Sequence, residues 1–182
     1  LYGIIQGLTE FIPVSSTAHL KVISHFLGLN DPGISVSAII QLGSVFAIIW
    51  FFRRDILKGG NLYFKNKLNI LRKFFISIFI GTMPILLLGG FVKFFIHNFF
   101  NTVLRSNFSI SIMSILMAIF MYFADISKSK FKNIGNHNFV DSLLIGISQA
   151  LAIVPGVSRS GITISTALLS GWERRDAAKF SF

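Results

Sequence analysis

Long apolar runs constrain the fold of this chain more than any other feature of its sequence. Segments long and apolar enough to cross or nearly cross a bilayer recur along it, at 35–52, 74–92, 108–124 and 140–154. Only 13% of the residues are charged, against about 25% in soluble domains, and the mean hydropathy is +0.70. The sequence therefore predicts an all-α, polytopic integral membrane protein.

Positive charge is concentrated between the apolar runs. Segment 53–73 carries seven Lys or Arg residues and one acid, and 125–139 carries three, whereas 93–107 carries two. Cytoplasmic loops of membrane proteins are enriched in Lys and Arg, so 53–73 and 125–139 are placed in the cytoplasm and 93–107 outside. This distribution explains the net charge of +10 better than nucleic-acid binding does, because no basic face interleaved with aromatic residues accompanies it.

Two polar stretches interrupt the apolar sequence, "GIIQGLTEFIPVSSTAHL" at 3–20 and "GISQALAIVPGVSRSGITIS" at 146–165. Each runs through Gly, Gln, an apolar helix and Pro into a Ser-rich turn. Paired breaks of this kind are typical of discontinuous membrane helices that build a site near the bilayer midplane. The sequence therefore predicts two repeats, each with a broken or re-entrant helix. Counting the predicted spans makes 1–12 and 140–154 cross the membrane in the same direction. Inverted repeats would cross in opposite directions, so the sequence leaves open whether the two repeats are inverted.

Glu10 and Arg159 are the charged residues that stand out in these stretches. Glu10 lies four residues after Gln6, so the two side chains share a helix face. A carboxylate within a membrane segment is energetically costly and is therefore more often functional than incidental. Arg159 carries a permanent charge whose planar fork matches phosphate oxygens. Because "GITISTALLSG" follows Ser160 rather than a polar loop, we favour a buried, anion-facing arginine over an interfacial anchor.

Hydroxyl side chains lie beside both charges. Ser15, Ser16 and Thr17 stand in tandem before a helix, where they either cap its N-terminus or contact phosphate, and both roles use the same helix end. His19 follows them closely, whereas the other three histidines are interpreted as structural. We predict phosphate contacts for Ser15, Thr17, Ser158, Ser160 and Thr163.

At these two motifs the sequence resembles the undecaprenyl-diphosphate phosphatase family, also called bacitracin-resistance proteins. "IQLGS" at 40–44, "FFRR" at 51–54 and "FSF" at 180–182 are similar to that family too. A typical member continues for several more membrane segments, so we expect 1–182 to be a single membrane domain truncated at both ends. The chain departs from the usual family pattern at Ala18, where Gly is common.

The resemblance implies hydrolysis of undecaprenyl diphosphate to undecaprenyl phosphate and inorganic phosphate. That reaction recycles the lipid carrier of cell-wall synthesis and confers bacitracin resistance. The resemblance also implies a multi-pass protein of the bacterial plasma membrane. The partners implied are the polyprenyl diphosphate and membrane lipids, without nucleic acid, and a homo-oligomer is allowed. The alternative is a secondary transporter or lipid flippase that binds phosphate at midplane without cleaving it.

The resemblance also implies roles for individual residues. Ser16 is favoured as nucleophile with His19 as its proton acceptor, and His19 as the nucleophile itself remains open. Arg159 would neutralise charge on the transferred phosphoryl group. A divalent cation, Mg²⁺ or Ca²⁺, would be held by Glu10 with Gln6. We therefore predict that the two polar stretches meet in one cavity that contains the four catalytic residues.

Overall fold

The computed structural model describes residues 1–30, 33–62, 68–127 and 131–182, and the secondary structure of this part is helical apart from one isolated bridge between Lys132 and Trp172. The all-α prediction is confirmed. The helices are α1 (Tyr2–Glu10), α2 (Ser16–Phe26), α3 (Gly33–Leu62), α4 (Leu68–Phe95), α5 (His97–Phe99), the π-helical turn η1 (Phe100–Leu104), α6 (Asn107–Asp125), α7 (Phe139–Leu151), α8 (Arg159–Leu169) and α9 (Arg174–Ser181).

Within the described residues, three helices are long and apolar enough to cross a membrane, at Ser35–Arg54, Arg72–Phe95 and Asn107–Asp125. They correspond to the first three predicted spans. The fourth predicted span, 140–154, is helical only as far as Leu151, so α7 has 13 residues. At 1.5 Å per residue α7 is about 20 Å long, which is shorter than the bilayer core of about 30 Å.

The predicted cytoplasmic segment 53–73 is largely helical rather than a loop. Helix α3 continues to Leu62 and α4 begins at Leu68, while 63–67 lie outside the described residues. Lys and Arg have high helix propensity, so a helix that leaves the apolar region does not need to end at its first basic residue. In the second predicted cytoplasmic segment, 125–139, residues 128–130 lie outside the described part of the chain.

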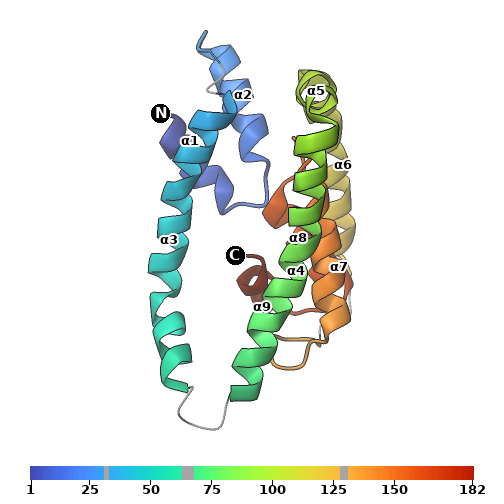
Figure 1. Cartoon of the computed structure of the whole chain (residues 1–182). Helices are drawn as coiled ribbons and strands as arrows, with labels where there is room; N and C mark the ends of the chain where they lie inside the picture. The colour runs from blue at the N-terminus through green and yellow to red at the C-terminus, as the bar shows by residue number, and fades with distance from the viewer. Residues whose placement is uncertain (31–32, 63–67, 128–130) are drawn as a thin grey trace.

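Two pairs of short helices lie between the long ones. Helices α1 and α2 are joined by 11–15, and α7 and α8 by 152–158. In Figure 1 the α1–α2 pair lies towards the upper end and α7–α9 lie lower, so that the turn between α1 and α2 faces α8. The two broken stretches, far apart in sequence, therefore meet in the middle of the molecule.

Close backbone contacts fix the α7–α8 pair against its neighbours. Gly146 of α7 lies against Gly81 of α4, and a Cβ at Gly146 would be 2.5 Å from the Gly81 carbonyl oxygen. Small residues permit such close packing of membrane helices. Gly156, in the turn before α8, has φ +100°, and its Cβ would meet the Ile110 carbonyl oxygen of α6 at 2.6 Å. Only glycine satisfies both the left-handed backbone and the lack of space.

A buried aromatic cluster joins the segment before α7 to α9. His137 is 1% exposed and packs on Trp172 and Phe180, with ring centroids 5.2 and 5.9 Å away. His137 Nδ1 lies 2.7 Å from the Ile134 carbonyl oxygen, and its Nε2 lies 2.7 Å from the Ser77 hydroxyl of α4. A carbonyl only accepts, so Nδ1 carries the hydrogen and Nε2 accepts from Ser77. Burial in this cluster favours the neutral imidazole, with Nε2 accepting from the Ser77 hydroxyl.

The preference for the neutral ring predicts how stability depends on pH. Burial lowers the pKa of His137 below its ordinary value of 6.5, and the positive charge of Lys73 acts in the same direction. Between the lowered pKa and 6.5 the unfolded chain binds more protons, so stability is fully present above 6.5 and is lost as pH falls through the folded pKa. We expect the stability of the protein in detergent to fall by up to about 1.4 kcal/mol per pH unit in this window. Thermal unfolding between about pH 5 and 8 measures it, and a His137→Gln variant that keeps the full slope would contradict this assignment.

Candidate active site

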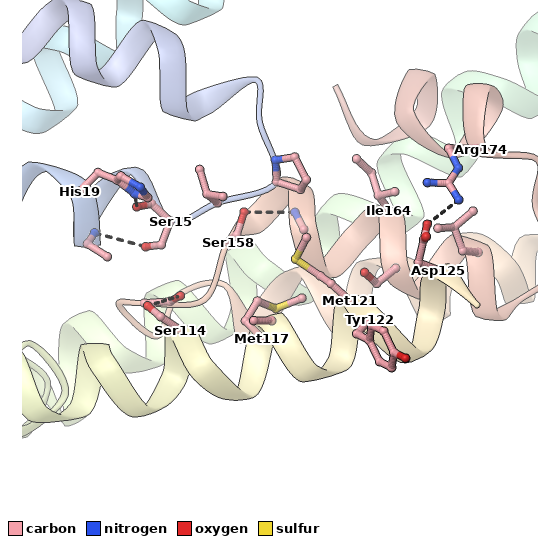
Figure 2. Close-up of a pocket in the computed structure, with 18 residues that line it drawn as sticks. Ser15, His19, Ser114, Met117, Met121, Tyr122, Asp125, Ser158, Ile164 and Arg174 are labelled. Atoms are coloured by element: carbon pink, nitrogen blue, oxygen red, sulfur yellow. Dashed lines mark hydrogen bonds and ion pairs between the residues drawn. The ribbon is translucent and has the colours of Figure 1, made fainter. Parts of the chain in front are cut away.

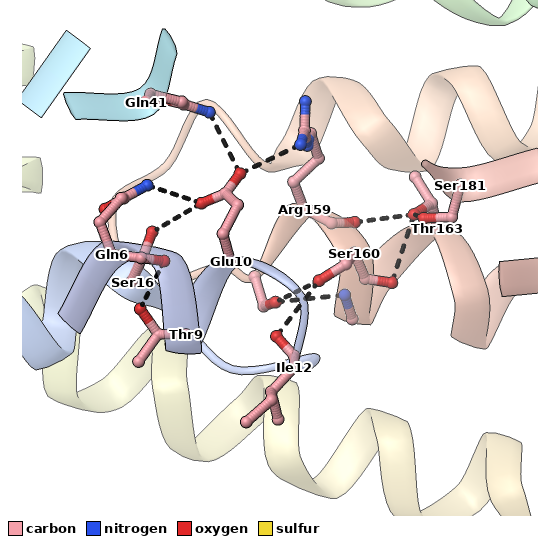
Figure 3. A network of polar contacts seen from close by, with 12 residues as sticks. Gln6, Thr9, Glu10, Ile12, Ser16, Gln41, Arg159, Ser160, Thr163 and Ser181 are labelled. Carbon is pink, nitrogen blue, oxygen red and sulfur yellow. Dashed lines mark hydrogen bonds and ion pairs between the residues drawn. The ribbon is translucent and has the colours of Figure 1, made fainter. Parts of the chain in front are cut away.

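Glu10, at the end of α1, and Arg159, at the start of α8, form an ion pair across 149 residues of sequence. The distance from Arg159 Nη2 to Glu10 Oε1 is 3.1 Å (Figure 3). The Glu10 side chain is only 9% exposed, whereas that of Arg159 is 42% exposed. Glu10 is therefore buried beside a partner of opposite charge, and the Arg159 side chain remains partly exposed.

The Glu10 carboxylate accepts from four side chains (Figure 3). Its Oε2 accepts from Gln6 Nε2 at 2.8 Å and from the Ser16 hydroxyl at 3.2 Å. Its Oε1 accepts from Gln41 Nε2 at 3.1 Å and from Arg159. An ionised carboxylate only accepts hydrogen bonds, so both glutamines must turn their NH₂ groups towards it. These donors come from α1, α2, α3 and α8, and Glu10 is therefore the point that joins four helices.

The N-termini of α2 and α8 meet at this point. Ser15 caps α2 by accepting from the Ala18 N–H at 3.3 Å, and Ser158 caps α8 by accepting from the Gly161 N–H at 3.1 Å. The first N–H groups of a helix have no carbonyl partner within it, and the helix dipole adds partial positive charge there. Two such ends beside Arg159 make a site suited to a phosphate group.

A cavity of about 180 Å³ lies between these helix ends. Most of the residues predicted from the sequence line it, together with Gln41. The polar lining consists of Glu10, Ser15, Ser16, Thr17, Gln41, Ser158, Arg159 and Ser160. The structure thus places Glu10, Ser16 and Arg159 in one cavity.

Thr163 and His19 lie elsewhere. Thr163 is 1% exposed, and its hydroxyl donates to the Arg159 carbonyl oxygen at 2.8 Å and contacts Ser181 of α9. A threonine in a helix readily bonds the carbonyl four residues before it, so Thr163 supports the first turn of α8 from behind rather than facing the cavity.

His19 lines a second, larger cavity instead of the one that contains Glu10 and Ser16. Its Nδ1 lies 2.8 Å from the Ser15 carbonyl oxygen (Figure 2). Because that carbonyl accepts, Nδ1 carries the hydrogen and Nε2 is the basic atom of the ring. Ser15 and Ser158 line both cavities and form the wall between them. The predicted contact between His19 and the Ser16 hydroxyl is therefore not present, and that hydroxyl donates to Glu10.

The larger cavity measures about 570 Å³ and is a groove between α2, α6 and α8. Met117, Met121 and Ala118 line it from α6, and Ile164 and Leu168 line it from α8. Figure 2 shows both methionines below the turn that carries Ser158. The groove is therefore lined mainly by apolar side chains, and it borders the polar cavity at the two capping serines.

Gln41 is the site residue that sequence reasoning missed. It lies in the N-terminal third of α3, in a segment apolar enough to cross a membrane, and it belongs to the "IQLGS" motif. Its signal is a polar amide between exposed apolar neighbours, since Ile39 is 67% and Leu42 is 56% exposed. An amide within such a span needs hydrogen-bond partners, and Glu10 provides one.

The donor set of the cavity limits which metal it could take. Among the described residues, no group of three or more His, Cys, Asp or Glu side chains could hold a metal ion. The oxygens available are those of the Glu10 carboxylate and the Gln6 amide. Mg²⁺ usually keeps several waters and binds through one or two carboxylates together with substrate phosphates. In this arrangement Glu10 accepts from four side chains and Gln6 turns its NH₂ group towards it. These residues would therefore fit a hard divalent cation only after Gln6 turned its amide oxygen towards Glu10 and one of the four donors left the carboxylate.

The fold and site define a helical membrane protein in which two helix N-termini and an Arg–Glu pair line a polar cavity between two pairs of short helices. The model of the family described as bacitracin resistance protein BacA matches residues 1–182, and the chain belongs to this family.

Similar proteins cover the whole chain. Undecaprenyl-diphosphatase of Prochlorococcus marinus (strain MIT 9215) is 65% identical over 100% of this chain and 69% of its own length. The protein of that name in strain MIT 9301 is 66% identical, again over 100% and 69%. Undecaprenyl-diphosphatase of Synechococcus sp. (strain CC9902) is 47% identical over 99% of this chain and 66% of its own length.

Proposed function

We propose that the cavity around Glu10 and Arg159 is where this chain hydrolyses undecaprenyl diphosphate to undecaprenyl phosphate and inorganic phosphate. The family and the curated names of its relatives support the reaction. The observation that supports this location is the ion pair that joins the two broken stretches beside two helix N-termini. Recycling of the lipid carrier of cell-wall synthesis and resistance to bacitracin follow from this activity.

In the mechanism we propose, Ser16 Oγ attacks the terminal phosphorus. Its proton passes to Glu10 Oε2, which already accepts from it at 3.2 Å. The bond between the phosphorus and the bridging oxygen breaks, and its electron pair leaves on undecaprenyl phosphate. A water molecule then hydrolyses the phosphoserine and releases inorganic phosphate. The contact between Ser16 and Glu10 favours Glu10 over His19 as proton acceptor.

Arg159 and the two helix N-termini supply the charge stabilisation. Phosphoryl transfer depends mainly on positioning and on neutralising charge that spreads over the phosphoryl oxygens. Donors that are already oriented before the reaction stabilise that charge most effectively. Arg159 is held in place by Glu10 at one end and exposed to the cavity at the other. The polyprenyl tail would leave the cavity past Ser15 and Ser158 into the apolar groove.

The helix pairs α1–α2 and α7–α8 are, in this proposal, two inverted repeats that enter the membrane from opposite faces as re-entrant helices. Each helix of α7–α8 is too short to span, and the breaks of both pairs meet at Glu10 and Arg159. Exposed backbone at that depth is tolerated where it lines a cavity. The bacterial plasma membrane is the location that the lipid substrate requires, and the homo-oligomer allowed by the sequence stays a prediction.

A divalent cation is also part of the proposal. To hold Mg²⁺ or Ca²⁺, Gln6 would turn its amide oxygen towards Glu10, and the carboxylate would release one of its four donors. The cation would supply neutralisation of diphosphate charge. We expect Gln6→Glu to raise the affinity for the cation, because a second carboxylate would bind it together with Glu10. Titration of Mg²⁺ by calorimetry measures the affinity in the presence of inorganic diphosphate. Equal Mg²⁺ affinity in the parent and in Gln6→Glu would show that Gln6 is not a ligand of the cation.

The proposed function is tested by phosphate release from undecaprenyl diphosphate, using purified protein in detergent, with and without EDTA. We expect release that EDTA suppresses. Full turnover in excess EDTA would support the proposed hydrolysis and contradict the proposed requirement for a divalent cation. Lipid binding without phosphate release would instead favour a transporter.

A further inference from the structure

We infer that Gln41 is a positioning residue that holds Glu10 so that most of the Arg159 fork stays open to the diphosphate. This inference rests on the proposed hydrolysis, because it concerns the same cavity. Nothing in the proposed mechanism uses Gln41, and its amide nevertheless reaches across from α3 to the carboxylate that organises the site.

The geometry at Glu10 Oε1 is the starting point. Gln41 Nε2 and Arg159 Nη2 both donate to this oxygen at 3.1 Å, while Gln6 and Ser16 donate to Oε2. A carboxylate offers about four acceptor positions, two on each oxygen. The four donors fill them, and Arg159 is left with a single point of contact.

The single contact matters because arginine and carboxylate pair more strongly through two parallel hydrogen bonds. In the bidentate arrangement the carboxylate would take two nitrogens that a phosphate also needs. Here the side chain of Arg159 is 42% exposed and bonded to Glu10 through Nη2. Glu10 and the substrate phosphate therefore compete for the N–H groups of Arg159, and Gln41 limits how many of them Glu10 takes.

Removing the Gln41 donor would free one position on Oε1. Oε1 could then accept a second N–H of the Arg159 guanidinium in place of Gln41, which would draw the fork towards Glu10 and away from the cavity. The substrate would have to break that stronger pair in order to bind. The loss would apply equally to the ground state and the transition state, because it precedes chemistry, and such a loss raises KM without lowering kcat.

The experiment compares Gln41→Met, which keeps the length but has no donor, and Gln41→Glu, which keeps the shape and, when ionised, only accepts. Leu42→Met is the matched control, since Leu42 is the next residue on α3 and is 56% exposed. We measure kcat and KM for undecaprenyl diphosphate, the inhibition constant of inorganic diphosphate, and the unfolding temperature.

We expect Gln41→Met to raise KM and the inhibition constant by about tenfold or more, which is the effect of losing a hydrogen bond to a charged group, with kcat within about twofold of the parent. Gln41→Glu should raise both further, because a second carboxylate also attracts Arg159. Leu42→Met should match the parent. If Gln41→Met does not fold, Gln41→Glu carries the test.

Unchanged KM and inhibition constant in both variants would overturn the inference. A fall in kcat and unfolding temperature at constant KM would also overturn it and reduce Gln41 to a packing contact between α1 and α3. If the parent releases no phosphate, the proposed hydrolysis fails, and direct calorimetry of inorganic diphosphate binding to parent and Gln41→Met still decides the role of Gln41.

Discussion

Arg159→Lys is expected to lower kcat by about 10²–10³ while the affinity for the lipid diphosphate stays close to that of the parent. Lysine keeps the positive charge but loses the planar fork, so it cannot offer one nitrogen to Glu10 and others to the transferred phosphoryl group. The charge that remains still attracts the diphosphate in the ground state. The oriented donors that the transition state needs are lost.

Lipid binding and phosphate release measured on the same preparation test this prediction. Arg53→Lys is a suitable control, because it makes the same change of side chain outside the site. Arg53 lies on α3, about three turns beyond Gln41, with its guanidinium over the Trp50 ring. If Arg159→Lys loses only affinity and keeps its kcat, Arg159 docks the substrate and does not stabilise the transition state.

The charged centre of the site could be predicted from the sequence because charge is rare in an apolar chain. Glu10 and Arg159 each interrupt a hydrophobic segment, and each has few structural explanations at that depth. The hydroxyls could be assigned less accurately. Ser16 faces the cavity and Thr163 does not, because hydroxyls also bond their own helix and sequence spacing does not separate the two roles.

Residues that reach the site from other helices could not be predicted from the two motifs. Gln41 lies on a separate long helix and meets Glu10 only through tertiary packing. His19 is three residues from Ser16, yet its ring bonds the Ser15 carbonyl and faces the neighbouring groove. Sequence spacing gives the helix face approximately, and the rotamer decides which of two adjoining cavities a side chain enters.

Helix types were predicted better than helix ends. Three spans follow from length and apolarity, but α3 and α4 continue into basic sequence and α7 ends at Leu151, before Pro155. Hydropathy indicates where the apolar part of a helix stops. The end of the helix itself depends on capping and packing, which hydropathy does not report.

Ser16→Ala is expected to reduce phosphate release by about 10²–10⁴ or more, the range for a group that takes part directly in bond making and proton transfer. The variant loses one of the four donors to Glu10, and the other three remain in place. Because the freed position on Oε2 could accept from Arg159, lipid binding is measured beside phosphate release, and the loss of the nucleophile appears as a fall in kcat. Mass spectrometry of the parent after brief mixing with substrate should find phosphate on Ser16.

Ser24→Ala provides the matched control for this prediction. Ser24 lies on the same helix, is 2% exposed, and donates to the Leu20 carbonyl oxygen at 2.7 Å, away from the cavity. Its loss should affect stability and leave turnover near that of the parent. If Ser16→Ala keeps its turnover while His19→Ala loses it, with phosphate found on histidine, the nucleophile is His19. The carboxylate contact at Ser16 would then serve only to orient the start of α2.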